Sequence, residues 1–421
     1  VSDSSQARPG ADLFWRTSSN FQLNATINPD FGNVESDAVV LNLSATETFF
    51  PEKRLFFLEG QEVFNATPRA DTRGRGVGNG GLPYTMVNTR RIGGKPRAPN
   101  LPANTAISQR DLIQQTELIG AIKTTAQAGA FRYGLLGAFE DDVKFNVVSD
   151  LGPEQIEAPG NQYGAARLLY ETSHKGDYRA IGVLSTAVLN PQRDALVSGI
   201  DWHYRTADGR VKVDGQYMTS KIDDVAGRGY GGFLDFELTW RQGLVHRIGL
   251  EYFDEKIDIN DFGFLERNDE YRIRTALAWT TSNIQWAREN QFDIRGFIQK
   301  SVSESLFNGG GVFLSNRLSL NNLSQLTARF NYFPGAYDDL NSFGNGTFRV
   351  QDTVDAGLNW NSDSTEIWQY ALMANYKTEQ IEDGDGFALG ANLKWKPNDH
   401  FSVDLGVRYA ERSGWLLHQR G

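Results

Sequence analysis

The chain has 421 residues, a formal net charge of -10 at pH 7, no cysteine, and 9 Trp, 15 Tyr and 26 Phe. The lack of cysteine excludes disulfides, zinc–thiolate sites and cysteine nucleophiles, and the acidic balance argues against nucleic acid as a partner, because neutralising phosphates needs a basic surface. No uncharged apolar run approaches the roughly 18 residues of a membrane-spanning helix.

The N-terminal region, residues 1–115, holds two short segments in which apolar and polar residues alternate. These segments are Phe21–Ile27 and Val39–Ala45. Alternation with period two places successive side chains on opposite faces of a strand. We therefore predict two strands in this region.

Between and after these strands the region is irregular. Phe49–Gly60 packs four phenylalanines around three adjacent charged residues, and residues 67–111 are dominated by Gly, Pro, Asn, Arg and Thr. A long segment of this kind in a barrel chain forms an outer loop or folds inward. We expect an inward plug in which Glu52, Glu59 and the arginines pair, and the alternative is a neck packed outside the barrel. The candidate plug residues are Glu52, Lys53, Arg54, Glu59, Arg90 and Arg91.

From about residue 116 to the end of the chain, at residue 421, the sequence becomes a succession of alternating segments of about ten residues. Clear examples are Leu234–Arg241, Tyr271–Trp279, Phe387–Trp395 and Phe401–Tyr409. Short turns separate them at Asp208-Gly209, Gln242-Gly243 and Lys396–Asp399, as in antiparallel hairpins. We predict an all-β fold, with roughly sixteen strands between Thr116 and Arg412.

The length of these strands favours a membrane barrel over a soluble sandwich or propeller. Soluble strands usually run about five or six residues, whereas tilted strands that cross a bilayer need about nine to eleven. Aromatic residues near the strand ends lie on the apolar phase, where interfacial girdles occur. These aromatic residues are Trp202, Tyr204, Trp240, Tyr252, Trp279, Tyr332, Trp395 and Tyr409. We therefore predict an antiparallel transmembrane β-barrel of about 16 or more strands.

The polar phase of the same strands carries charges of both signs, which cannot enter a dry core in such numbers. We expect them to line a water-filled lumen or to hold a plug in place. The candidate lumen residues are Arg210, Lys212, Asp214, Asp235, Glu237, Arg241, Arg272 and Arg274.

Local patterns that could support ligand chemistry are weak. Gly76–Gly81 has no preceding strand and no following helix, so a loop explains it better than a phosphate site. Asp383 and Asp385 resemble part of a calcium loop, although their position between two strands favours a hairpin tip. No Gly-x-Ser-x-Gly elbow occurs, and a solvated lining explains the acid pair Asp235 and Glu237 without catalysis. We expect no cofactor beyond a structural calcium ion in a loop, and no enzyme.

Several motifs spread along the chain form a distinctive combination: Gly10–Arg16, Asn28–Gly32, Phe49–Arg54 with Phe56–Gly60, Thr89–Gly93 and Gly263–Asp269. Together they resemble a bacterial family of unknown function, DUF5916. Leu55 departs from the proline that this pattern leads us to expect. The resemblance implies an outer-membrane barrel and, in a longer protein, a preceding domain similar to carbohydrate-binding module family 9. It implies no activity and no catalytic residues.

The leading hypothesis is a transport or translocation pore in a bacterial outer membrane, plugged or gated, that contacts lipid and lipopolysaccharide. It would work with a periplasmic or surface protein and a saccharide-binding domain. The alternative is a sealed barrel that anchors a binding or assembly scaffold. A barrel-embedded hydrolase acting on lipid or polysaccharide is the third reading.

Overall fold

The computed structural model describes residues 9–29, 45–70, 84–99, 101, 105–149, 152–342, 345–378 and 384–413. One antiparallel sheet of 18 strands dominates it, beside small sheets of three and two strands. The chain divides into two compact units. Unit 1 comprises Val1–Ala207, Val213–Leu234 and Phe253–Asp269, and unit 2 comprises Asp208–Lys212, Asp235–Tyr252 and Glu270–Gly421. Among the described residues, no helix is long and apolar enough to cross a membrane.

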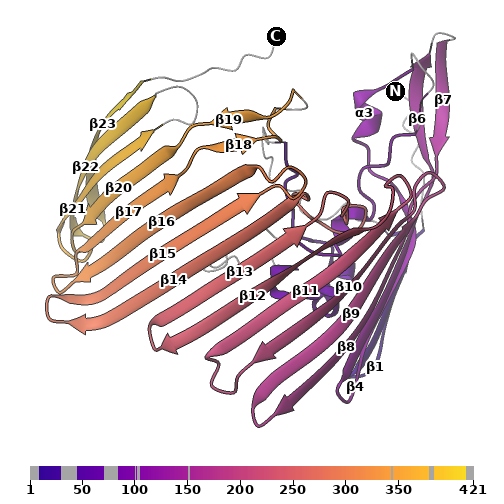
Figure 1. Cartoon of the computed structure of the whole chain (residues 1–421), viewed down its shortest axis with the longest axis horizontal. Helices are drawn as coiled ribbons and strands as arrows, with labels where there is room; N and C mark the ends of the chain where they lie inside the picture. The colour runs from indigo at the N-terminus through magenta and orange to yellow at the C-terminus, as the bar shows by residue number, and fades with distance from the viewer. Residues whose placement is uncertain are drawn as a thin grey trace. The chain divides into compact units, whose positions relative to one another are not determined.

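In unit 1 the strands of the large sheet pair with their sequence neighbours, in the order β1, β2, β4, β5, β8, β9, β10 (Figure 1). Their bounds are β1 Ala11–Ser18, β2 Phe21–Ile27, β4 Leu118–Ala128, β5 Phe131–Glu140, β8 Gln162–His174, β9 Asp177–Leu189 and β10 Ala195–Arg205. Residues of both units contribute to β11 Val211–Ile222, β12 Gly229–Arg241 and β13 Leu244–Phe253. Short turns join several of these strands. Lys175 and Gly176 between β8 and β9 have φ values of 52° and 89°, the left-handed pair that matches strand twist in a tight hairpin.

A segment between β2 and β4 covers one face of these strands. We call residues 45–70 and 84–99 the covering segment. Its helical turns are α1 Leu55–Leu58, α2 Gln61–Phe64, η1 Pro68–Ala70 and η3 Thr89–Arg91. Phe57, Phe64 and Ile92 of this segment are buried in one apolar cluster with strand residues such as Leu136 and Leu184. The hydrophobic core of unit 1 therefore lies between the covering segment and the sheet, not within the sheet.

The opposite face of the same strands is bare and apolar. Along β9, Leu184 is fully buried, whereas its neighbour Val183 is 47% exposed. Along β5, Leu136 is 5% exposed and Leu135 is 54% exposed. Because adjacent strand residues point to opposite faces, one face packs on the covering segment and the other presents large apolar side chains outward.

A three-stranded sheet stands apart from the large sheet within unit 1. It pairs β3 Ala106–Ile107 with β6 Val143–Ser149, and β6 with β7 Gly152–Ala158. Figure 1 shows α3 Gln109–Leu112 beside this hairpin. The sheet has its own small core, in which Phe145 and Val147 are buried.

Unit 2 continues the large sheet as another run of antiparallel neighbours. Its strands pair in the order β14, β15, β16, β17, β20, β21, β22, β23. Their bounds are β14 Glu270–Ile284, β15 Ala287–Lys300, β16 Phe307–Leu320, β17 Gln325–Phe333, β20 Thr353–Asn361, β21 Trp368–Thr378, β22 Asp385–Asn398 and β23 Phe401–Arg412. A hairpin of β18 Ala336–Asp338 and β19 Phe348–Val350 lies between β17 and β20.

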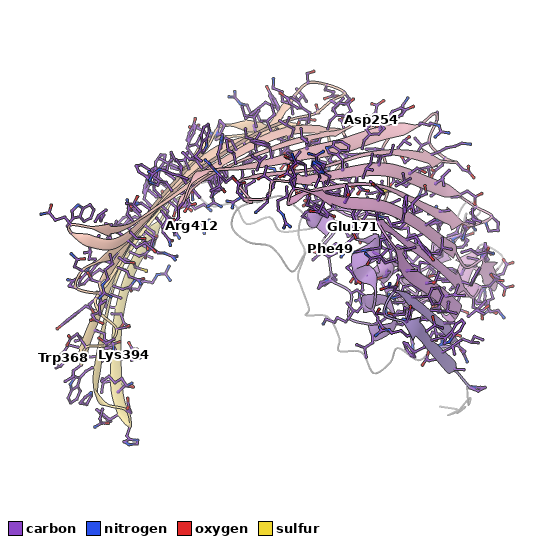
Figure 2. All side chains as sticks on the ribbon, turned by 90° about the horizontal axis from the view of Figure 1, so that it is seen from below. Phe49, Glu171, Asp254, Trp368, Lys394 and Arg412 are labelled. Carbon is purple, nitrogen blue, oxygen red and sulfur yellow. The ribbon has the colours of Figure 1, made fainter. Side chains whose placement is uncertain are left out.

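Unit 2 also has two chemically different faces. In Figure 2, Trp368 and Lys394 project from opposite sides of β21 and β22, in keeping with a register that pairs Lys394 with Gln369. The apolar face exposes residues such as Leu372, Leu389 and Leu405. We call the other face, which carries Arg295, Arg317 and Lys394, the polar face of unit 2.

The predicted all-β antiparallel architecture is confirmed. Of the 18 strands in the large sheet only β1 and β2 precede residue 116, which leaves sixteen after it, as expected. The strand predicted at Val39–Ala45 lies outside the described residues apart from Ala45, and Gly76–Gly81 lies outside them entirely. The turn predicted at Lys396–Asp399 is wrong. There β22 continues to Asn398 through a register shift after Trp395, an irregularity that tolerates Pro397 because proline has no N–H for the ladder.

The packing of α1 gives a first prediction. Phe57→Ala removes a ring that is 1% exposed and should lower the free energy of unfolding by about 3–5 kcal/mol, since it leaves a cavity under the covering segment. Urea unfolding of the purified protein measures this. The control is Leu55→Ala in the same helix, because Leu55 is 82% exposed and its loss should change the free energy by no more than about 0.5 kcal/mol. Equal effects of the two substitutions would contradict the proposed packing.

Candidate functional site

The covering segment is held first by an ion pair within itself. Arg54 donates to both carboxylate oxygens of Glu52 at 2.9 and 2.8 Å, and the two side chains are 7% and 2% exposed. Arg54 also donates to the carbonyl oxygens of Ile92 at 2.8 Å and Thr89 at 2.5 Å. The Thr89 hydroxyl donates to Glu52 at 2.6 Å. A buried guanidinium needs such complete pairing, and the result ties residues 52–54 to residues 89–92.

Burial disfavours the ionised form of the Glu52 carboxyl, but the groups around the carboxyl favour that form more strongly. Desolvation alone would raise the pKa of the Glu52 carboxyl. The hydrogen bonds and positive charge of Arg54, together with the Thr89 hydroxyl, lower that pKa below its ordinary value. Glu52 is therefore an ionised, fully engaged anchor.

Strand β4 contributes a second anchor through Lys123. Its buried ammonium group donates to the carbonyl oxygens of Phe56, Phe57 and Glu59, which lie at the C-terminal end of α1. A cation is favourable there because the last carbonyls of a helix lack intrahelical partners. This contact joins the covering segment to the sheet itself.

The expected pairing of Glu52, Glu59 and the arginines is present in part. Glu52 pairs with Arg54, as described above. Glu59 accepts from Arg16 of β1 at 3.2 Å and from Asn24 of β2 at 3.0 Å, neither of which was among the predicted residues. Arg91 pairs with Glu47 at 2.7 Å.

Two other predicted plug residues, Lys53 and Arg90, take part in this region through their backbone N–H groups. The backbone N–H of Lys53 donates to the Glu52 side chain at 2.9 Å. The backbone N–H of Arg90 donates to Asn88 at 3.3 Å, which caps η3.

The loop Asp254–Asp269 between β13 and β14 closes over the covering segment within unit 1. Thr85 and Phe264 exchange backbone hydrogen bonds of 3.0 and 2.8 Å. The rings of Phe49 and Phe264 meet edge to face at 4.9 Å, and Arg91 donates to the carbonyl of Gly263 at 3.2 Å. Three motifs that are far apart in sequence, Phe49–Gly60, Thr89–Gly93 and Gly263–Asp269, therefore converge here.

Charged residues fasten the same loop. Asp261 accepts from Arg97 of the covering segment at 2.5 Å and from Arg193 at 3.1 Å. Arg193 also pairs with Asp258 at 2.9 Å and Asp224 at 2.7 Å. Burial raises the pKa of Asp261, and neighbouring Asp258 adds to this, although Arg193 and Arg97 oppose it.

Sequence reasoning missed a buried ionic network on β8, β10 and β11. The Arg167 guanidinium donates to both carboxylate oxygens of Asp201, a bidentate ion pair. The Asp201 carboxylate also lies 2.9 Å from His203 Nε2. His203 Nδ1 lies 2.6 Å from Asp214. Both ring nitrogens thus face carboxylates, which requires both to carry protons. Asp214 was expected in the lumen lining, but it belongs to this network.

Other predicted lumen residues form ion-pair ladders in unit 2. Glu237 accepts from Lys212 at 2.7 Å and from Arg247 at 2.6 Å. Glu251 pairs with Arg274, and Arg272 pairs with Glu270 at 3.0 Å. Period-two alternation places these partners on one face of neighbouring strands.

The remaining predicted lining residues lie elsewhere or at strand ends. Arg210 donates to the carbonyls of Thr239 and Trp240 at 3.0 and 2.5 Å, at the margin of β12. The Arg241 guanidinium lies 6.0 Å from the Trp279 ring centroid. Asp235 shares a strand phase with Glu237.

The structure holds no cluster that suggests a metal site among the residues it describes. Asp383 lies outside those residues. Asp385 begins β22 and accepts from the Ser413 hydroxyl at 2.8 Å.

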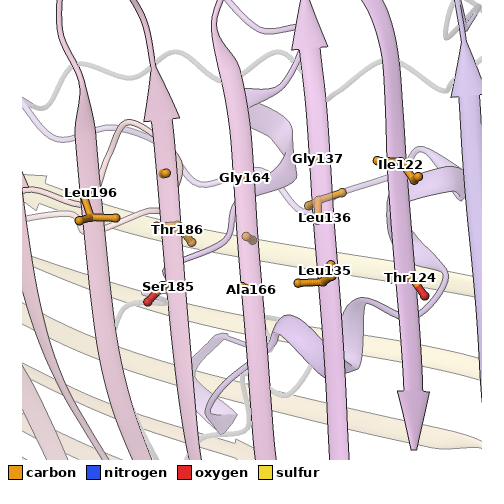
Figure 3. Close-up of a pocket in the computed structure, with 12 residues that line it drawn as sticks. Ile122, Thr124, Leu135, Leu136, Gly137, Gly164, Ala166, Ser185, Thr186 and Leu196 are labelled. Atoms are coloured by element: carbon orange, nitrogen blue, oxygen red, sulfur yellow. The ribbon is translucent and has the colours of Figure 1, made fainter.

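A shallow hollow of about 440 Å³ lies over β4, β5, β8, β9 and β10 (Figure 3). Small residues such as Gly164 and Ala166 form its floor, and Ile122, Leu135 and Leu196 rise around it. Its lining residues include no acid, base or metal ligand. It offers no catalytic group.

These features define a class: an all-β protein with one large antiparallel sheet whose faces are apolar and ionic, and a covering segment held by buried ion pairs. The chain belongs to the family described as "Domain of unknown function (DUF5916)", which matches residues 2–416. The family resemblance noted in the sequence is thereby confirmed. No curated protein matches the chain.

Among solved structures, the chain is similar to the outer membrane protein opdK from Pseudomonas aeruginosa. The TM-score is 0.34, the sequence identity is 10%, and the alignment covers 73% of this chain and 91% of that one.

The Glu52–Arg54 pair predicts an acid-sensitive covering segment. Because the pKa of Glu52 is lowered by folding, its stabilising effect is complete above the ordinary carboxyl pKa of about 4.3 and is lost as the pH falls through the folded value. Glu52→Gln leaves Arg54 without a carboxylate and should lower the free energy of unfolding by about 3–5 kcal/mol at neutral pH. Urea unfolding at a series of pH values measures both effects.

The control for this prediction is Glu47→Gln. Glu47 is half exposed in its pair with Arg91, so its loss should change the free energy by at most about 1 kcal/mol. If Glu52→Gln and the natural chain lose stability along the same acid curve, Glu52 is not the titrating anchor.

Proposed function

We propose that this chain forms an outer-membrane β-barrel and works as a transport or translocation pore closed by the covering segment. The observation that supports this proposal most strongly is that the large sheet has two chemically different faces. One face exposes large apolar side chains, and the other carries charged and hydrogen-bonded groups. A lipid-facing exterior and a polar interior call for this arrangement.

The exposed aromatic side chains of the apolar face support the proposed contact between this face and lipid. Trp240 is 55% exposed, Tyr252 50% and Trp279 44%, and the first two lie next to the last residue of their strands. Soluble monomers seldom leave contiguous apolar patches of this kind in water. Lipid chains and the headgroups of a bilayer, including lipopolysaccharide, suit this surface. Closure of the sheet into a barrel would then satisfy its edge strands, as a membrane requires.

The charged contacts that hold the covering segment support the proposal that this segment is a plug inside the barrel. Its charges at Glu52 and Arg54 are satisfied by groups within unit 1, and Lys123 of β4 holds the end of α1. A segment that lay outside the barrel would place these charges against lipid. An inward position keeps them with protein and water.

The alternative is a sealed barrel that anchors a binding or assembly scaffold. The extent of the buried core beneath the covering segment favours it, because a tightly packed plug would not open easily. The three-stranded sheet with α3 would be a surface for a periplasmic or surface partner, and a saccharide-binding domain would be another. We propose no catalytic role, since the hollow over β4–β10 lacks acid–base groups.

Deletion of the plug separates the two functions. Removal of residues 49–64, which include α1 and α2, should increase single-channel conductance in a planar bilayer at least severalfold, because it takes away the packed core over β4 and β5. Leu55→Ala is the control, since its exposed side chain takes no part in that core. Unchanged conductance with a correctly folded protein would favour the sealed anchor. A chain that stays folded and monomeric without any amphiphile would overturn the membrane proposal altogether.

A disulfide lock tests whether the plug must move. A Cβ atom at Gly60 would lie 3.9 Å from Thr125 Cβ, which is suitable for a disulfide, and the chain has no other cysteine. In oxidised Gly60→Cys/Thr125→Cys protein we expect spontaneous openings to disappear and to return on reduction. The two single-cysteine variants are the controls, since Gly60 has φ +70° and a side chain there adds strain by itself. Openings that persist in the oxidised protein would contradict a mobile plug.

A further inference from the structure

Arginines on the polar face of unit 2 fall into two groups. Arg272 and Arg274 of β14 are matched by Glu270 and Glu251. On the neighbouring strands, Arg295 of β15 and Arg317 of β16 make no ion pair or hydrogen bond with any residue that the structure describes, and the Nε atom of Arg295 is buried. Arg295 as a whole is half-buried and has no carboxylate partner among the described residues, so its guanidinium has unused capacity for an anion.

Arg295 lies among phenylalanines. In the β15–β16 register Phe313 stands directly opposite Arg295, and Phe297 is two residues along the same strand and therefore on the same face. The rings of Phe297 and Phe313 are stacked, with centroids 6.0 Å apart, and Phe333 meets Phe313 edge to face at 5.2 Å. The register therefore places an arginine next to phenylalanine positions on a face that is otherwise hydrophilic.

The wider polar face favours an anion over a cation. Cations outnumber carboxylates on the registered positions of β14 to β23, although the chain as a whole has a net charge of -10. The cations on this face are Arg272, Arg274, Arg295, Arg317, Arg329, Lys377, Lys394, Arg408 and Arg412. The carboxylates on this face are Glu289, Asp293, Asp355 and Asp404, with Glu270 just before the first registered residue of β14. Such an excess raises the local concentration of anions.

We propose that Arg295, Phe297 and Phe313 form a binding site for a small organic anion. The carboxylate or similar group of the ligand accepts hydrogen bonds from the Arg295 guanidinium, whose fork suits two oxygens. The apolar ring or chain of the ligand lies on the phenyl rings. Asp293 shares this face two residues from Arg295, yet it makes no ion pair with it within 4.0 Å, so it does not occupy the position of the ligand.

If the chain is the proposed pore, this site identifies small organic anions as the class of solute that the pore takes up. The inference rests on the proposed function only for the route by which the solute reaches the site. Binding itself needs no conductance. The ligand must carry both features, because an inorganic anion would use Arg295 alone and a neutral aromatic compound would use the rings alone.

Isothermal titration calorimetry of the full-length protein in detergent micelles tests the site, with benzoate, acetate and benzylammonium as probes. Benzoate should bind more tightly than acetate, and benzylammonium should not bind. Arg295→Met should weaken benzoate binding about 10- to 100-fold, the effect of a lost hydrogen bond to a charged group. Arg408→Met removes an arginine from the same polar face on β23 and is the matched control, with benzoate affinity within about twofold of the natural chain.

Phe313→Leu keeps a large apolar side chain and removes the ring face. It should reduce the preference for benzoate over acetate severalfold while leaving acetate binding unchanged. This variant also serves if Arg295→Met fails to fold. Equal affinities for benzoate and benzylammonium, or equal losses in Arg295→Met and Arg408→Met, would overturn the proposal.

Conductance measured in parallel separates this proposal from the pore. Benzoate binding that depends on Arg295 in a protein without channel activity would support the site and refute the pore. Channel activity that neither benzoate nor Arg295→Met alters would support the pore and refute the site.

Discussion

The covering segment depends on one constraint, that a charge taken out of water must meet its full set of partners within the protein. Arg54 satisfies this constraint with Glu52 and the carbonyls of Thr89 and Ile92. These contacts bring together residues almost 40 positions apart in the sequence. Removing either charge would leave the other buried and unpaired, which is far more destabilising than losing a surface pair. The packing of Phe57 and Ile92 against the sheet follows from this arrangement, because the ion pair positions both.

The two faces of the sheet follow from the same constraint applied to strands. Arg167 of β8 and Asp201 of β10 are buried and pair with each other, and His203 of β10 pairs with Asp214 of β11. On the opposite face apolar side chains need no partner, yet water is a poor surrounding for so many of them. A bilayer, as proposed above, would remove this apolar face from water.

The strands were predictable because their signal is local. Phe401–Tyr409 alternates residue by residue, and β23 spans Phe401–Arg412. The anchors were not predictable, since Lys123 finds its partners more than 60 positions earlier, in Phe56 and Glu59. The sequence showed that Glu52 and Arg54 needed pairing, but only the fold of α1 determines that they pair with each other. His203 looked isolated in sequence for the same reason: Asp201 shares its strand face, while Asp214 arrives from β11.

Arginine therefore serves two purposes in this chain, and the difference lies in its neighbours. Arg54, Arg167 and Arg274 have carboxylates at hydrogen-bond distance, which leaves their charges neutralised and makes them structural. Arg295 has phenyl rings beside it in place of a carboxylate. Evolution toward stability alone would favour a neutral side chain at that position, since a methionine would pack on Phe313 without an unpaired donor. An arginine without an ion-pair partner among the described residues at that position fits the proposed site, in which the anion comes from outside the chain and the neighbouring rings favour an apolar group on that anion.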